Sequence, residues 1–124
     1  MKKGHFNNRG ELFFEIDLVA VDSSIVTVVD AMLDTGFTDW LAMNLQDIDS
    51  LGWSYLKKQD KQTAGGIIEF NHYIGTVLFD NQEITIPVIG GDQFTHVLMG
   101  LQWLNHRRLI VDKKRDLLTL EDVS

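Results

Sequence analysis

Apolar and β-branched residues of this chain gather in short runs that come in pairs, with a few polar residues between the members of each pair. Runs that partly alternate apolar and polar residues and are joined by tight turns are typical of β-hairpins. The turns are Asp22-Ser23, Asp80-Asn81 and residues 113–116. The paired runs are 11–21 with 24–33, 67–80 with 82–90, and 109–112 with 117–121. Strands at this spacing predict a β-sandwich or a β-barrel.

Two segments follow a helical pattern instead. In the first, Asn44 is a suitable N-cap, apolar residues follow at helical spacing, and Gly52 suits the position after the last turn. The second covers residues 101–108, where Leu101 and Leu104 stand three apart. The pattern as a whole therefore predicts a mostly β protein with two short helices.

The composition is that of one globular domain, and we expect a single domain over residues 1–124. The chain has 124 residues, of which 44% are hydrophobic, so it can form a core of its own. It has no cysteine, which excludes disulfides and cysteine-ligated metal sites. The formal net charge of −7 argues against a nucleic-acid or membrane partner. The small basic clusters at 57–61 and 113–116 are expected to be solvated turns.

The ends and the apolar runs of the chain bear on its location. Residues 1–10 contain lysines but no apolar segment of the signal-peptide type. Apolar runs all fall short of the ~18 residues that a membrane-spanning helix needs. We therefore expect a cytoplasmic protein.

One carboxylate stands where the pattern calls for burial. Asp34, with Thr35 and Gly36 after it, lies between the apolar residues 31–33 and 40–43. A buried carboxylate is costly unless it is hydrogen-bonded or shares a proton with another group. In the simplest interpretation this Asp-Thr-Gly is a turn whose aspartate caps backbone amides.

A second motif changes the interpretation of the first. Residues 95–104 place Leu98, Met99 and Gly100 at the end of an apolar strand and before a helical segment. Between the two motifs, residues 61–70 form a glycine-containing hairpin. In order, spacing and length the chain resembles the retropepsin-like aspartic proteases, above all the small bacterial type, over roughly residues 10–121.

The resemblance implies a fold, a partner and an activity. The fold would be a closed, all-β acid-protease barrel with a flap hairpin and one or two short helices, and the chain would form a homodimer. The activity would be that of an aspartic endopeptidase, acting on a peptide or protein without a cofactor. Asp34 of each chain would lie at the two-fold axis, where the two carboxylates share one proton and activate a water.

The resemblance also assigns roles to individual residues. Thr35 would reach across the two-fold axis with its hydroxyl, and Gly36 would offer its backbone to the substrate. Phe37 and Thr38 would follow in the substrate-binding cleft. The residues expected at the tip of the flap are Ala64, Gly65 and Gly66. Those expected to support the active loop from below are Leu98, Met99 and Gly100.

The chain departs from the family at four positions. Phe37 stands where the family usually has alanine or serine, so no hydroxyl is available there and the large ring is expected to narrow the cleft. Thr38 and Leu101 stand where retroviral members have a paired aspartate and arginine, so both partners are missing together. Gln102 stands where many bacterial relatives have aspartate. These departures bear on catalytic strength and substrate range.

Two alternatives keep part of this interpretation. In one, the domain is a weak or inactive dimerisation or peptide-binding module with the same fold. In the other, it is a monomeric β-barrel in which Asp-Thr-Gly occurs by chance. A metal site is not expected, because the four histidines are scattered without metal-binding spacing. Cysteine nucleophiles and Gly-x-Ser-x-Gly elbows do not occur.

Overall fold

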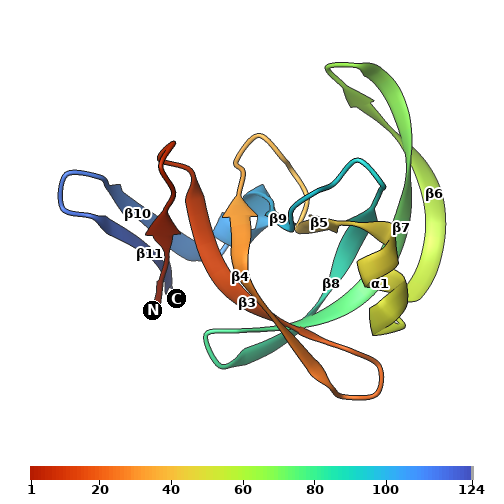
Figure 1. The fold of residues 1–124 in the computed structure, drawn as a ribbon, viewed down its shortest axis with the longest axis horizontal. Coiled ribbons are helices and arrows are strands. Elements are labelled where there is room, and N and C mark those ends of the chain that lie inside the picture. Colours follow the sequence, from red (N-terminus) through yellow and green to blue (C-terminus); the bar gives the residue numbers. More distant parts are fainter. Residues whose placement is uncertain (124) are drawn as a thin grey trace.

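A computed structural model describes residues 1–123 as a mostly β protein (Figure 1). Its strands are β1 (Lys2–Lys3), β2 (His5–Phe6), β3 (Leu12–Val19), β4 (Ile25–Leu33), β5 (Leu41–Met43), β6 (Ser54–Thr63), β7 (Gly66–Phe79), β8 (Gln82–Gly90), β9 (Leu98–Met99), β10 (Arg107–Asp112) and β11 (Leu117–Asp122). The helical elements are α1 (Leu45–Leu51) and the 3-10 turn η1 (Leu101–Leu104).

Six strands close into a barrel, which confirms the barrel prediction. They pair in the order β3-β4-β9-β5-β8-β7, and β7 then pairs back onto β3 through residues such as Leu78 opposite Asp17. Closure leaves these strands without a free edge at the point of pairing. A second sheet, β1-β11-β10, lies beside the barrel and brings the two ends of the described chain together (Figure 1).

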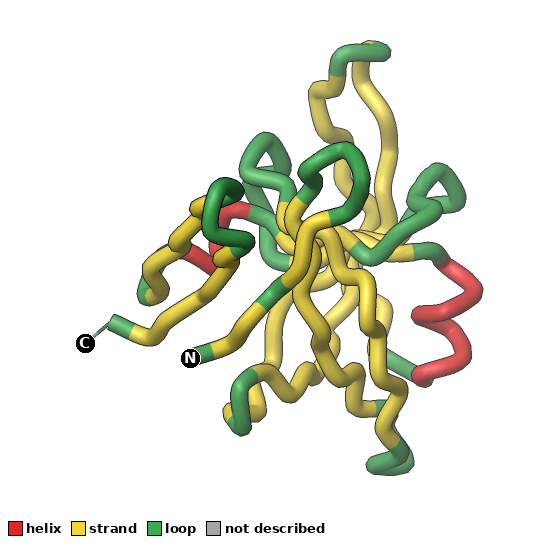
Figure 2. Tube along the Cα trace, turned by 60° about the vertical axis from the view of Figure 1, so that its left-hand side comes forward, coloured by secondary structure: helices red, strands yellow, loops and turns green. Residues whose placement is uncertain are grey.

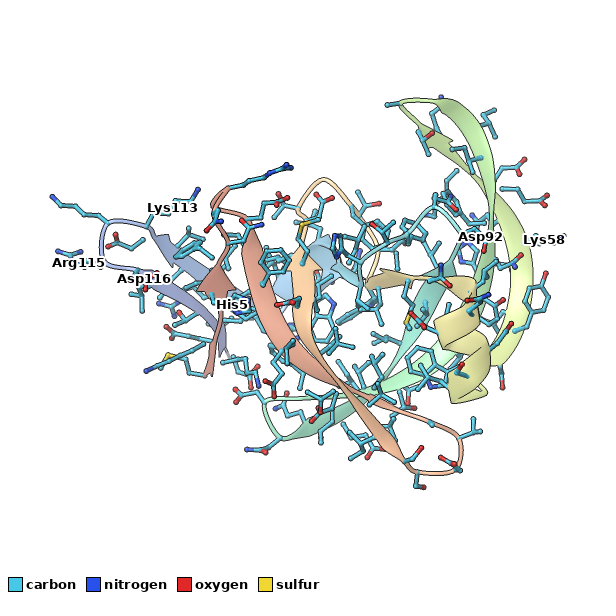
Figure 3. The ribbon with its side chains drawn as sticks, viewed as in Figure 1. His5, Lys58, Asp92, Lys113, Arg115 and Asp116 are labelled. Atoms are coloured by element: carbon cyan, nitrogen blue, oxygen red, sulfur yellow. The ribbon has the colours of Figure 1, made fainter. Side chains whose placement is uncertain are left out.

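The three predicted hairpins are confirmed. β3 and β4 are joined at a turn where Asp22 accepts hydrogen bonds from the amide and hydroxyl of Ser24, both through Oδ1. β7 and β8 are joined at Asp80 and Asn81, which both have positive φ, as the tight turns between strands require. β10 and β11 are joined by residues 113–116, a turn seen at the left of Figure 3.

The core lies inside the barrel and continues under the small sheet. Alternation along β3 points Phe14, Ile16 and Leu18 inward, as the period of a strand requires. Trp103 is completely buried and its ring packs edge-on against Phe79, with ring centroids 5.1 Å apart. This apolar cluster fixes the end of the barrel near η1.

The first predicted helix is confirmed and the second is wrong beyond Leu104. In α1, the Asn44 side chain accepts from the amide of Gln46, and Gly52 takes a left-handed φ of 73°. The second segment makes only the turn η1, and Arg107 already lies in β10, opposite Asp122 of β11. Pairing with β11 therefore outweighs the local helical pattern.

The two basic clusters differ from each other. Residues 113–116 are a turn, as predicted, and Arg115 pairs with Asp112 at 3.0 Å. Residues 57–61 are not a turn, because they lie inside β6 and pair with β7. Polar residues on an edge strand do not show the apolar alternation on which the strand predictions rest.

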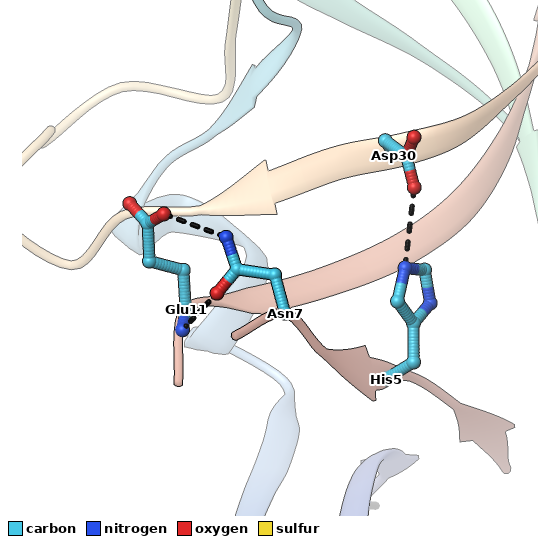
Figure 4. A network of polar contacts seen from close by, with 4 residues as sticks. All are labelled: His5, Asn7, Glu11 and Asp30. Atoms are coloured by element: carbon cyan, nitrogen blue, oxygen red, sulfur yellow. Dashed lines mark hydrogen bonds and ion pairs between the residues drawn. The ribbon is translucent and has the colours of Figure 1, made fainter. Parts of the chain in front are cut away.

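Polar contacts hold β2 to the barrel and close the loop that follows it (Figure 4). His5 Nε2 lies 3.2 Å from Asp30 Oδ1 on β4, and Asn7 donates to Glu11 at 2.8 Å.

Among residues 1–123, no helix is both long and apolar enough to cross a membrane.

The β6–β7 hairpin projects from the barrel and forms an arm of its own (Figures 1 and 2). Thr63 and Gly66 are opposite each other at its end, and Gly66 has a φ of 107° that residues with a side chain rarely adopt. The glycine-containing hairpin predicted between the motifs is thus present.

Candidate active site

The two sequence motifs lie side by side. β9 pairs in parallel with β4, where Leu33 is opposite Met99, and antiparallel with β5, where Leu41 is opposite the same residue. The amide of Asp34 donates to the carbonyl oxygen of Met99 at 2.9 Å. Asp34 therefore leaves the end of β4 at a point fixed by neighbours on both sides of β9.

The Asp34 side chain is half-buried, whereas Thr35 and Gly36 are exposed. Its Oδ1 accepts a hydrogen bond of 2.9 Å from the amide of Gly36, and the Asp34 carbonyl accepts one of 3.1 Å from Phe37. In the single chain the carboxylate thus caps a tight turn and still faces solvent.

Gly100 brings the second motif against the loop that follows Asp34. Its amide donates to Trp40 O at 3.0 Å, and the next amide, from Leu101, donates to Phe37 O at 2.7 Å. A side chain at Gly100 would place its Cβ 1.9 Å from the carbonyl oxygen of Asp39. Only glycine permits this approach, so the predicted supporting role of Gly100 has a steric basis.

Two side chains that the sequence did not single out as supports also hold this loop. Gln102 Nε2 donates to Thr38 O at 3.1 Å, and Trp103 Nε1 donates to Trp40 O at 2.7 Å. Both bonds join the loop after Asp34 to the segment after the second motif. The departures at Thr38 and Leu101 are thus accompanied by other bonds between the same two segments.

A groove of about 580 Å³ opens beside Asp34. Three aromatic residues line it: Phe37 on the loop after Asp34, Phe70 on β7, and Phe94, with the rings of the last two stacked at 5.6 Å. Polar residues of β6 line it beside Phe70, which is paired with Gln59. The complete lining is Asp34, Gly36, Phe37, Thr38, Asp39, Gln59, Asp60, Lys61, Gln62, Thr63, Phe70, Ile89 and Phe94.

Searches with the sequence found no relatives: no protein-family model and no curated protein matches it. Searches with the structure did. A retropepsin-like aspartic protease from Rickettsia conorii superposes with a TM-score of 0.63 at 21% identity, over 98% of this chain and 89% of that one. EIAV protease in complex with the inhibitor HBY-793 superposes with a TM-score of 0.58 at 15% identity, over 80% of this chain and 89% of that one. The chain has the retropepsin-like fold.

Within this retropepsin-like fold, the sequence-predicted residues fall into three places. Asp34, Gly36, Phe37 and Thr38 line the groove, while Thr35 lies next to it and is exposed. The supporting residues Leu98, Met99 and Gly100 lie beneath the loop. The predicted flap residues Ala64, Gly65 and Gly66 lie at the end of the β6–β7 hairpin and are not part of the groove lining.

Sequence reasoning missed the contribution of β6 and of the segment around Phe94. Residues 59–61 line the groove although their composition indicated a solvated turn. The pattern of β7 could have indicated that residues 54–63 form a strand, because a strand as long as β7 needs a pairing partner along its length. The sequence offered one indication that Phe94 belongs to the site, namely an aromatic residue between Gly91 and the second motif.

His72 is buried beside this groove. Its Nε2 has no hydrogen-bond partner within residues 1–123. Burial lowers the pKa of the His72 imidazole from its ordinary value of 6.5, and the charges of Lys61 and Lys57 lower it further, while Asp39 acts in the opposite direction. His72 is therefore a neutral group near neutral pH. Within residues 1–123, no group of three acidic or histidine side chains is placed to hold a metal ion.

Proposed function

We propose that the protein is an aspartic endopeptidase that works as a homodimer, with one Asp34 from each protomer in a shared site. The observation that supports it most is the position of Asp34: a half-buried carboxylate on a rigidly held turn, opening onto a groove of about 580 Å³. Asp-Thr-Gly occurs once in the chain, so a pair of carboxylates requires two chains.

The chemistry would follow from two carboxylates that share one proton. The ionised member removes a proton from a water, which attacks the scissile carbonyl carbon. The protonated member donates to the carbonyl oxygen, so the tetrahedral intermediate forms without a separate oxyanion. Proton transfer to the leaving nitrogen then releases the two peptides.

The substrate would bind in an extended form beneath the β6–β7 hairpin. The Gly36 backbone and the hairpin ending in Ala64, Gly65 and Gly66 offer polar main-chain groups to an extended peptide, as in β-strand addition. Phe37 and Thr38 would contact its side chains. In this role the hairpin acts as the flap, and the exposed Thr35 hydroxyl would meet the second protomer.

The second candidate function is a peptide-binding module without hydrolysis. It is favoured by Phe37, which lines the groove at a position where the family usually has a small residue. A narrowed groove would hold a peptide away from the carboxylates. Binding would then remain while cleavage is lost.

A library of quenched fluorescent peptides separates these functions. The endopeptidase predicts cleavage by the wild type and none by Asp34→Asn, at equal folded content. The binding module predicts that the wild type and Asp34→Asn both bind peptides of the library and that neither cleaves them. Sedimentation of the cleaving form tests the dimer, because a strict monomer that cleaves peptides contradicts a shared site.

A further inference from the structure

The groove is bridged by an ion pair between its two walls. Lys61 Nζ on β6 contacts Asp39 Oδ2 on the loop after Asp34, and both side chains are about one-third exposed, at 28% and 36%. Lys61 and Asp39 both line the groove. The pair thus joins the projecting hairpin to the loop that carries the candidate catalytic acid.

The outer part of the β6–β7 hairpin, residues 57–70, has few other contacts that hold it to the barrel. β6 pairs with β7 alone, and β8 reaches β7 only from Asn71 onward. Residues 57–63 and 66–70 therefore form a two-stranded ribbon, a type of structure that is only marginally stable on its own. Contacts to the barrel must set its position.

The side-chain register directs Lys61 toward the groove. Gln59 is opposite Phe70, and Lys61 is opposite Ile68. Residues directly opposite each other share a face of the sheet, and alternate residues along a strand share it as well. Because Phe70 faces the groove and stacks on Phe94, Lys61 faces it too.

Asp39 provides a fixed anchor for that lysine. Its carbonyl oxygen accepts from the Gln102 amide at 3.4 Å and lies against Gly100, where no side chain fits. The neighbouring Thr38 carbonyl accepts from the Gln102 side chain at 3.1 Å. The Asp39 backbone is therefore held by the second motif, whereas Lys61 belongs to the ribbon.

We propose that the Lys61–Asp39 ion pair is a latch that holds the β6–β7 hairpin over the catalytic loop, and that both are positioning residues for substrate. The latch opens to admit a peptide and closes again over it. Its role in catalysis rests on the proposed function, whereas its role in holding the hairpin does not.

Hairpin mobility tests the latch independently of activity. Because the chain has no cysteine, Ala64→Cys gives a single site at the exposed hairpin end for a nitroxide label. In this background, Lys61→Gln and Asp39→Asn are expected to increase label mobility in electron paramagnetic resonance spectra. Exchanging the two residues, as Lys61→Asp with Asp39→Lys, is expected to restore the restricted spectrum.

Lys58→Gln is the matched control. Lys58 lies on the same strand and pairs with Glu69 at 3.7 Å, but both side chains are about 60% exposed, at 60% and 59%. Figure 3 shows it on the side of the hairpin away from the barrel. Its loss is expected to leave the spectrum unchanged. If Lys61→Gln and Lys58→Gln give the same spectrum as the parent, the latch is overturned.

Peptide kinetics supply the second readout. A latch that clamps substrate and transition state equally predicts that Lys61→Gln raises KM about fivefold at low salt and leaves kcat nearly unchanged. High salt is expected to raise the KM of the wild type toward that of the variant. Increased label mobility in Lys61→Gln without any peptide cleavage supports the latch and removes the proposed function. Unchanged label mobility in Lys61→Gln together with normal peptide cleavage overturns the latch and leaves the proposed function standing.

Discussion

The backbone amide of Asp34 donates a hydrogen bond of 2.9 Å to the carbonyl oxygen of Met99. The bond joins the loop after β4 to β9, so two motifs far apart in the sequence become one unit. The position of the candidate catalytic acid then depends on everything that holds β9, including Gly100 and the Asp39 backbone packed against it. Changes beneath the loop are expected to act on the site above it.

Replacing Asp34 by asparagine tests the catalytic assignment. Asp34→Asn is expected to abolish peptide cleavage, because neither protomer then supplies a general base. The fold and the dimer are expected to persist, since the amide is nearly isosteric and like-charge repulsion disappears. Cleavage rates and sedimentation, measured on the same preparation, check both statements. If Asp34→Asn cleaves peptides as fast as the wild type, the two Asp34 carboxylates are not the catalytic pair.

Thr35 is expected to matter for assembly more than for folding. Its side chain is exposed in the single chain, next to the carboxylate that would meet the second protomer. Thr35→Ala is expected to weaken the dimer by about 1 kcal/mol for each hydrogen bond lost. Analytical ultracentrifugation over a concentration series measures this. Thr38→Ala, also exposed and in the same loop, is the control and should leave the dimer constant unchanged.

A methyl group at Gly100 should be costly. In Gly100→Ala the new Cβ would lie 1.9 Å from Asp39 O, and the backbone must shift to relieve this contact. We expect a loss of about 3 kcal/mol in unfolding free energy, at the upper end of overpacking effects. Urea denaturation at fixed protein concentration provides the measurement.

Gly65→Ala is the control for that substitution. At Gly65 the nearest atom to a new Cβ would be Thr63 Oγ1 at 3.8 Å, an ordinary contact, and its φ is not positive. Its effect on unfolding free energy is expected to be within about 0.5 kcal/mol. Similar losses in the two variants would show that the contact with Asp39 is not the cause.

Local signals in the sequence were enough for the elements that form locally. Asp22 marks a turn because its side chain caps a backbone amide, and Asn81 marks one because it adopts a positive φ. Asn44 and Gly52 mark the ends of α1. The candidate acid could be found because it belongs to the first of two motifs that occur in the order and at the spacing of the family that the chain resembles. The predicted retropepsin-like fold is accordingly confirmed by the barrel and by the solved structures that it resembles.

Long-range contacts were not available from the sequence. The helical pattern after Leu104 gave no sign that Arg107 pairs with Asp122, and the polar residues of β6 gave no sign that they line a groove. Both depend on partners distant in the chain, and propensity is a weak guide where tertiary pairing decides. The ion pair of Lys61 with Asp39 is of the same kind.

His72 is expected to make folding stability depend on pH. Burial lowers the pKa of its imidazole in the folded protein below the ordinary value of 6.5, with Lys61 and Lys57 adding to the effect and Asp39 opposing it. Between the folded and unfolded pKa values, the unfolded chain binds more protons, so the unfolding free energy rises with pH. The contribution is complete above about pH 6.5 and is lost as the pH falls from there toward the folded pKa.

His72→Phe should remove this dependence. The ring keeps a similar shape, has no proton to bind, and removes the unpartnered Nε2. We expect unfolding free energies from urea titrations that vary less between about pH 5 and about pH 7 than those of the wild type. The control is His96→Phe, at an exposed histidine, which should retain the wild-type slope. Equal slopes for the wild type and His72→Phe would place the acid sensitivity on another group.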